Sequence, residues 1–167
     1  MNIFRPKAES ANAELDDALA IAQAEYLRGS LYVATIGTTA VILVLTYFFW
    51  GSDLASELTT WCVFGLFATT GRLALMFISR EPLYFKSNPM VARRFLYGYT
   101  ITTVISGLVF GYGWLTIIPH LSLYEQLVYL LSIIALLFGG LFAYSPYFPT
   151  FIAFSSTALW ISPLLLD

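Results

Sequence analysis

Long apolar stretches separated by short polar segments dominate this chain. A helix needs roughly 20 mostly apolar residues to cross a hydrocarbon core about 30 Å thick. Five stretches have this length, and each predicts a membrane-spanning helix: residues 31–50, 59–79, 95–118, 124–142 and 147–166. We therefore expect an all-α fold, a polytopic bundle of about five transmembrane helices that occupies residues 31–167 and lies in the lipid bilayer.

Residues 1–30 predict a short amphipathic helix ahead of the first span. Apolar side chains recur along it at helical spacing: Leu15, Leu19, Ala22 and Tyr26. The segment is acidic, unlike the basic start of a signal peptide, and its acidity disfavours contact with anionic lipid. The apolar stripe therefore predicts contact with protein, such as a second copy of the chain, with a solvated face as the alternative.

Composition agrees with a membrane protein and excludes other classes. Hydrophobic residues make up 59% of the 167 residues and charged residues only 11%, whereas soluble domains carry about 25% charged residues. The formal net charge is −2, which argues against a nucleic-acid partner because such binding needs clustered Lys and Arg.

The basic residues predict which way the helices run. Three of them precede the first span: Arg5, Lys7 and Arg28. Four lie between the second and third spans: Arg80, Lys86, Arg93 and Arg94. Residues 51–57 and 119–126 contain no Lys or Arg. Because Lys and Arg accumulate in cytoplasmic loops, the amino terminus is expected in the cytoplasm. Four tryptophans fall toward the opposite end and predict an aromatic belt there: Trp50, Trp61, Trp114 and Trp160.

Several segments resemble a bacterial sensor family. The residues that carry the resemblance are Gly71-Arg72-Leu73, AQAEYLRGSL (22–31), VARRFL (91–96), SGLVFGYGW (106–114) and the run 138–166. Together they resemble the amino-terminal six-helix membrane module found ahead of diguanylate cyclase domains and of histidine kinases. The resemblance implies a homodimeric sensor in the bacterial inner membrane that controls a cytoplasmic output domain, with a cyclase favoured over a kinase.

The number of predicted spans determines on which side of the membrane residue 167 is expected. Five spans and a cytoplasmic amino terminus leave residue 167 on the outer side. The six-helix family has a further span that returns the chain to the cytoplasm, where its effector domain follows. We therefore expect a sixth span and an effector beyond residue 167; a five-helix protein with an abrupt outer end is the alternative.

Catalytic and metal-binding patterns are missing from the sequence. It contains one histidine, His120, one cysteine, Cys62, and no glycine-rich phosphate loop. We therefore predict no enzymatic activity, metal or cofactor for these 167 residues. His120 follows Pro119 at the predicted outer interface, where it is either a solvated loop residue or a pH sensor.

Arg72 is the one basic residue inside a predicted span and the one charge in the second span. A charge in the membrane is costly and often functional. Its place near the inner end leaves two interpretations: a side chain that snorkels to the headgroups, or one with an intramembrane partner such as a backbone carbonyl or a Tyr hydroxyl. We predict a candidate signal pocket that contains Arg72, Thr102, Thr103, Ser106 and Tyr147.

Two rows of small residues predict close helix packing. Gly107 and Gly111 form a GxxxG pattern in the third span, and Ala135, Gly139 and Ala143 form a second row in the fourth. Small residues let helix backbones approach, within one bundle or between subunits.

The sequence thus supports two classes of function. The favoured one is an input module that senses a small hydrophobic ligand or the state of the membrane. The alternative is a structural or accessory subunit of a larger membrane complex. A half-transporter is a weaker third class, because the chain shows no internal repeat and no charge at the midplane of a span.

Overall fold

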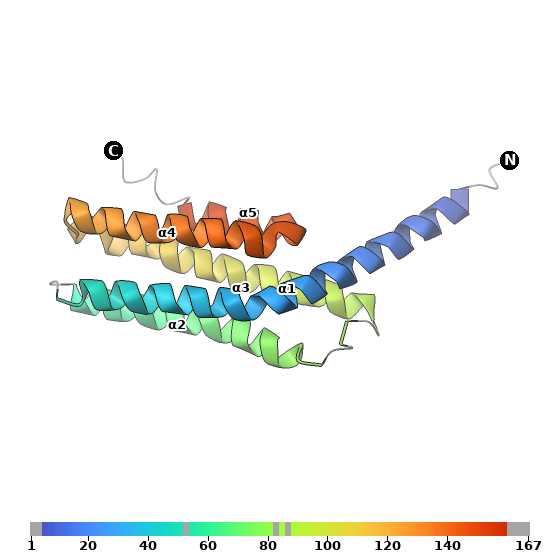
Figure 1. The fold of residues 1–167 in the computed structure, drawn as a ribbon, viewed down its shortest axis with the longest axis horizontal. Coiled ribbons are helices and arrows are strands. Elements are labelled where there is room, and N and C mark those ends of the chain that lie inside the picture. The colour runs from blue at the N-terminus through green and yellow to red at the C-terminus, as the bar shows by residue number, and fades with distance from the viewer. Residues whose placement is uncertain (1–4, 52–53, 82–83, 86–87, 160–167) are drawn as a thin grey trace.

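The structure is a computed structural model that describes residues 5–51, 54–81, 84–85 and 88–159; for residues 5–11 and Ser145 it describes the backbone only. The described chain is all-α (Figure 1). Its helices are α1 (Arg5–Phe49), α2 (Ala55–Ile78), α3 (Pro89–Thr116), α4 (Leu123–Tyr144) and α5 (Phe148–Leu159), with single 3-10 turns at Ile118–His120 and Ser145–Tyr147. Helices α1 to α4 are each long and apolar enough to cross a membrane. The prediction of a multi-pass helical membrane protein is confirmed to that extent.

The fifth predicted span is only partly described. Helix α5 has 12 described residues, which at 1.5 Å per residue cover about 18 Å, less than a hydrocarbon core. The remainder of the expected span, residues 160–166, lies outside the described residues. What the structure describes of α5 packs mainly against α3.

Helix α1 is longer than the span predicted for it. The amphipathic helix expected ahead of the first span and the span itself are one helix, because α1 runs without a break for 45 residues. No proline occurs between Lys7 and Phe49 to interrupt it. At 1.5 Å per residue the helix is about 68 Å long, roughly twice the thickness of a hydrocarbon core. We call its first half, residues 5–28, the arm; its amino-terminal part extends beyond the bundle (Figure 1), whereas the part from Ala20 onward packs against the bundle.

The connections divide between two ends of the bundle. The arm and the α2–α3 connection lie at one end, and the α1–α2 and α3–α4 connections lie at the other (Figure 1). We call these the arm end and the far end. Four basic residues with described side chains belong to the arm end: Arg28, Arg80, Arg93 and Arg94. The loops that contain Lys or Arg and the loops that lack them thus lie at opposite ends of the bundle, as their charges predicted.

The arm contacts the bundle through one face and leaves the predicted apolar stripe on its outer side, where contact with a second copy stays a prediction. Ala20, Ala24 and Leu27 are buried in a core cluster with Phe85 and Ala92 of the α2–α3 region. The predicted apolar stripe points away instead: Leu15, Leu19, Ala22 and Tyr26 are all exposed. Because α1 is one continuous helix, its rotation inside the bundle determines which arm residues meet the connection. The small Ala20 and Ala24 side chains allow the close approach that occurs there.

A second core cluster lies at the far end and corrects the predicted tryptophan belt. Trp61 is fully buried in this cluster and donates its indole N–H to the carbonyl oxygen of Val109 at 2.9 Å. It is a core residue and not part of a lipid-facing belt. Trp50 is exposed and Trp114 is half-buried, whereas Trp160 lies outside the described residues.

Candidate binding site between α1 and α4

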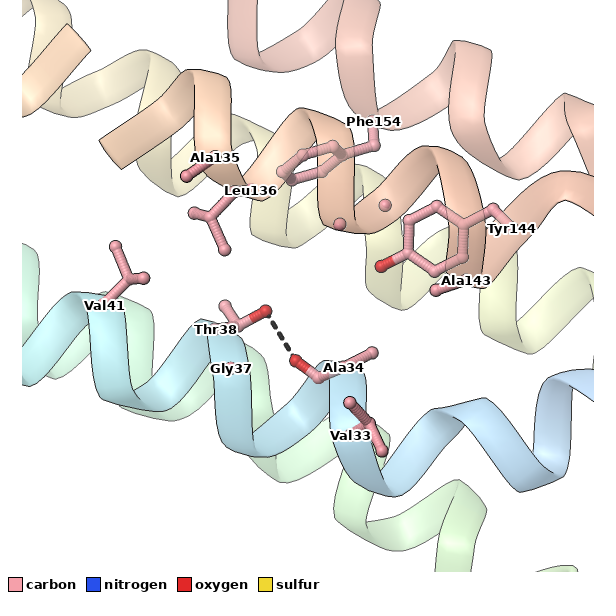
Figure 2. A pocket seen from close by; sticks show the side chains of 12 residues that line it. Val33, Ala34, Gly37, Thr38, Val41, Ala135, Leu136, Ala143, Tyr144 and Phe154 are labelled. Carbon is pink, nitrogen blue, oxygen red and sulfur yellow. Dashed lines mark hydrogen bonds between the residues drawn. The ribbon is translucent and has the colours of Figure 1, made fainter. Parts of the chain in front are cut away.

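A cavity of about 260 Å³ lies between α1 and α4 (Figure 2). Helix α1 lines it over three turns with Val33, Ala34, Gly37, Thr38 and Val41. Helix α4 forms the opposite wall with Ala135, Leu136, Gly139, Gly140, Ala143 and Tyr144, and Phe154 of α5 closes it from behind. The wall is apolar except for the hydroxyl groups of Thr38 and Tyr144.

Small residues create this space. A Cβ atom added to Gly37 or to Gly139 would meet no atom within 4 Å. The two helices therefore face each other there with glycine and alanine and leave a gap where larger side chains would have met. Val33, Ala135 and Gly139 are themselves exposed, so the cavity opens onto the outside of the bundle between α1 and α4.

A buried arginine stands behind the polar part of the wall. Arg72 of α2 is fully buried, and its Nη1 atom donates to Thr38 Oγ1 at 2.8 Å and, at 3.5 Å, to the Ala34 carbonyl oxygen. The Thr38 hydroxyl in turn donates to the Ala34 carbonyl at 2.8 Å, the bond drawn in Figure 2. Arg72 thus has hydrogen-bond partners on α1, and its side chain is enclosed by the bundle.

Part of the Arg72 guanidinium has no hydrogen-bond partner among the described residues. Its Nε and Nη2 atoms are buried and unpaired. The buried hydroxyl of Tyr99, on α3, has no hydrogen-bond partner among the described residues either. Tyr99 packs edge to face on Tyr144, with 5.8 Å between the ring centres. We call Thr38, Arg72, Tyr99 and Tyr144, one residue from each of four helices, the polar cluster.

The other predicted pocket residues lie elsewhere. Thr102 and Thr103 both donate to the Tyr99 carbonyl, and Ser106 donates to the Thr102 carbonyl, so each hydroxyl is satisfied within α3. Tyr147 is half-buried beside the arm-end core. None of these four lines the cavity. Among the five predicted residues, Arg72 alone takes part in the polar cluster.

The two predicted rows of small residues have different surroundings. A Cβ atom on Gly107 would collide with Thr157 and would lie 2.9 Å from the Phe154 carbonyl oxygen, so Gly107 sits at a close approach of α3 and α5. Gly111 is buried in the same helix. The row on α4 lines the cavity with Ala135, Gly139 and Ala143; a Cβ atom on Gly139 would meet nothing within 4 Å, whereas Ala143 also packs against the arm-end core.

Thr38 and Tyr144 are not among the site residues that the sequence predicts. One signal was available: a charge in the second span needs an acceptor, and the first span supplies threonines at several positions. The pattern does not say which threonine faces Arg72. That choice depends on the relative rotation of α1 and α2.

Comparisons with known proteins do not assign this chain to a family. The chain matches no protein-family model, no curated protein and no solved structure. The resemblance to bacterial sensor modules therefore stays a prediction that rests on the sequence segments named above.

Proposed function

We propose that this chain is the membrane-embedded input domain of a bacterial signalling protein. In this proposal a small hydrophobic molecule enters the α1–α4 cavity from the bilayer and changes the packing of α1 against α4. The change is relayed to a cytoplasmic output domain. The support comes from a cavity that opens onto the outside of the bundle and from a polar cluster, unusual inside a span, at its wall.

The single observation that carries the proposal is the continuity of α1. The segment from Val33 to Val41 forms one wall of the cavity, and the same unbroken helix continues into the arm. In the arm, Ala24 and Leu27 pack against Phe85 of the α2–α3 connection. A helix without a break transmits a shift or rotation along its length, so a ligand at Thr38 is mechanically connected to the charged end of the bundle.

Contacts near Arg28 provide a place where such a shift would be felt. The Arg28 guanidinium donates to the Ser79 and Glu81 carbonyl oxygens, at 3.3 and 2.9 Å, and lies over the Phe85 ring at 5.7 Å. These bonds tie the arm to the carboxyl end of α2. Signalling requires two arrangements that differ in ligand affinity, and a different position of α1 would exchange these contacts for others.

The proposal also specifies the orientation of the chain in the membrane, its oligomeric state and its output domain. The loop charges support a cytoplasmic arm in the inner membrane, and residues 147–166 are proposed to form a fifth span that begins with α5. A homodimer is proposed because the exposed stripe on the arm offers a surface to a second copy. The sequence resemblance favours a diguanylate cyclase over a histidine kinase as the output.

The test is regulation of an output by the cavity. The gene product, with any sequence that follows residue 167, is assayed in native membranes for cyclic-di-GMP synthesis and for autophosphorylation. Gly139→Leu fills the cavity and is expected to change the output several-fold. Gly29→Leu, at another glycine whose Cβ would meet nothing within 4 Å, is the matched control and should not. Equal outputs from both variants, or no output at all, would contradict the proposal.

A second candidate is an accessory subunit of a membrane complex. The observation that favours it is the large exposed face of α4, which carries Leu131, Phe138 and Phe142. An accessory subunit would bury this face against partner helices. Phe138→Ala should then reduce the size of the assembly extracted in mild detergent and leave any output activity unchanged.

A further inference from the structure

The polar cluster contains a positive charge that no described residue balances. Arg72 makes no ion pair within the described chain, and the carboxylates of α2 and its flanking residues are remote along the helix. Glu57 precedes Arg72 by 15 residues and Glu81 follows it by nine, which correspond to about 22 and 13 Å along a helix. A buried charge is strongly disfavoured unless it is paired. The site therefore lacks an anion.

The residues around Arg72 indicate that an anion would approach it from the α1–α4 cavity. Thr38 separates the guanidinium from the α1–α4 cavity and contacts both. Tyr144 lines the same cavity, and in Figure 2 its hydroxyl points toward the part of α1 that carries Thr38. The remaining walls are aliphatic or aromatic. An acidic group on an apolar tail matches this distribution, with the acid at Thr38 and Tyr144 and the tail against Val33, Leu136 and Phe154.

We propose that the cavity binds a small single-chain carboxylate, whose charge compensates Arg72. This inference rests on the proposed role of the cavity as a ligand site and names the chemical class of its ligand. The Thr38 hydroxyl, which now donates to the Ala34 carbonyl, would turn to the carboxylate. The Tyr144 hydroxyl would donate a second bond. Charge-assisted hydrogen bonds of this kind are about twice as strong as neutral ones.

The volume of the cavity limits the size of this carboxylate. An apolar cavity of about 150 Å³ accommodates benzene, and drug-sized ligands occupy pockets of about 300–1,000 Å³. At about 260 Å³, the α1–α4 cavity lies between these cases and suits a chain of medium length. A phospholipid with two long acyl chains does not fit inside it.

Octanoate and octan-1-ol test the proposal, because they have the same tail and differ in charge. The purified chain is reconstituted in nanodiscs of zwitterionic phosphatidylcholine, and binding of each probe is measured by calorimetry against empty nanodiscs. We expect octanoate to bind the protein at least tenfold more tightly than octan-1-ol. Equal affinities would overturn the proposal without reference to any variant.

Two variants with matched controls locate the binding. Arg72→Gln should abolish the preference for octanoate, whereas Arg80→Gln, at an exposed arginine, should retain it. Gly139→Leu should weaken both probes at least tenfold, whereas Gly29→Leu should not. Retention of the preference in Arg72→Gln, with helicity unchanged, would place the charge recognition elsewhere and overturn the proposal.

Three further outcomes separate this inference from its alternatives. If phosphatidylglycerol in the nanodisc saturates the site and octanoate does not bind, the anion is a bilayer lipid and the proposal is wrong. If octanoate binds as expected but never alters the output, the ligand class stands and the sensory function fails. If cavity variants alter the output although no carboxylate binds, the sensory function stands and the ligand class fails.

Discussion

Trp61 and Val109 join α2 to α3 through a hydrogen bond from the indole Nε1 to the carbonyl oxygen, 2.9 Å long and fully buried. Tyr129 of α4 makes the equivalent bond to the neighbouring carbonyl of Phe110, also at 2.9 Å. Gly113 leaves room for both rings, because a Cβ atom there would collide with the Tyr129 hydroxyl and lie 3.0 Å from the Trp61 nitrogen. Two aromatic side chains thus fasten two helices to one segment of α3.

Trp61→Phe should therefore destabilise the protein. The substitution removes one buried hydrogen bond and part of a packed ring, and we expect a loss of about 1–3 kcal/mol in the free energy of unfolding. Trp50→Phe is the matched control at a residue that is 56% exposed, with an expected change within about 0.5 kcal/mol. Equilibrium unfolding in detergent measures both. Similar losses in the two variants would mean that Trp61 does not serve as a core residue.

A glycine-to-alanine substitution should have opposite effects in the two rows of small residues. In Gly107→Ala the new methyl group meets the backbone oxygen of Phe154, which has no rotamer to change, so overpacking should cost about 1–3 kcal/mol. In Gly139→Ala the methyl group enters open space, and the higher helix propensity of alanine should stabilise the protein by up to about 1 kcal/mol. Thermal unfolding of both variants decides the matter. Destabilisation by Gly139→Ala would show that another chain packs on α4.

Leucines on opposite faces of the arm distinguish the face that packs on the bundle from the exposed stripe. Leu27 is fully buried, and Leu27→Ala should cost about 2–5 kcal/mol. Leu19 is 54% exposed, and Leu19→Ala should change the stability of the monomer by no more than about 0.5 kcal/mol. Hydrogen exchange along residues 12–28 gives a second measurement, since Leu27→Ala should accelerate it. The reverse ranking would mean that the arm packs on the bundle through the Leu15–Leu19 stripe.

Thr38 and Arg72 should be energetically coupled. Thr38→Val leaves the buried Nη1 atom without its best acceptor and should cost about 1–3 kcal/mol. In an Arg72→Met background that donor is absent, so the same substitution should cost almost nothing. The difference, about 0.5–3 kcal/mol in a double-mutant cycle, measures the interaction. Additive effects would contradict the hydrogen bond.

Reporter fusions test the orientation of the bundle. Fusions after Arg28 and within residues 80–94 should report a cytoplasmic location, and fusions within residues 51–57 a periplasmic one. The physical reason is the concentration of Lys and Arg at the arm end. A periplasmic signal from residues 80–94 would invert the topology and with it the proposed relay to the cytoplasm.

Local sequence determined the parts of this protein that depend on one segment at a time. Apolar length alone identified the helices α1 to α4, because a span must satisfy its backbone hydrogen bonds internally and cover the hydrocarbon core. The loop charges predicted which connections lie at the same end of the bundle. The importance of Arg72 was also apparent, since a charge inside an apolar stretch needs a partner.

Tertiary structure decided everything that depends on how two helices are rotated against each other. The arm packs through Ala20 and Ala24 because the buried part of α1 sets its rotation, although Leu15 and Leu19 form the more apolar stripe. Trp61 is a core residue because α3 offers it a carbonyl and a glycine. The α4 glycines line a cavity because α1 presents Gly37 opposite them. In a membrane, lipid and core are both apolar, so periodicity does not distinguish a face that packs from a face that meets lipid.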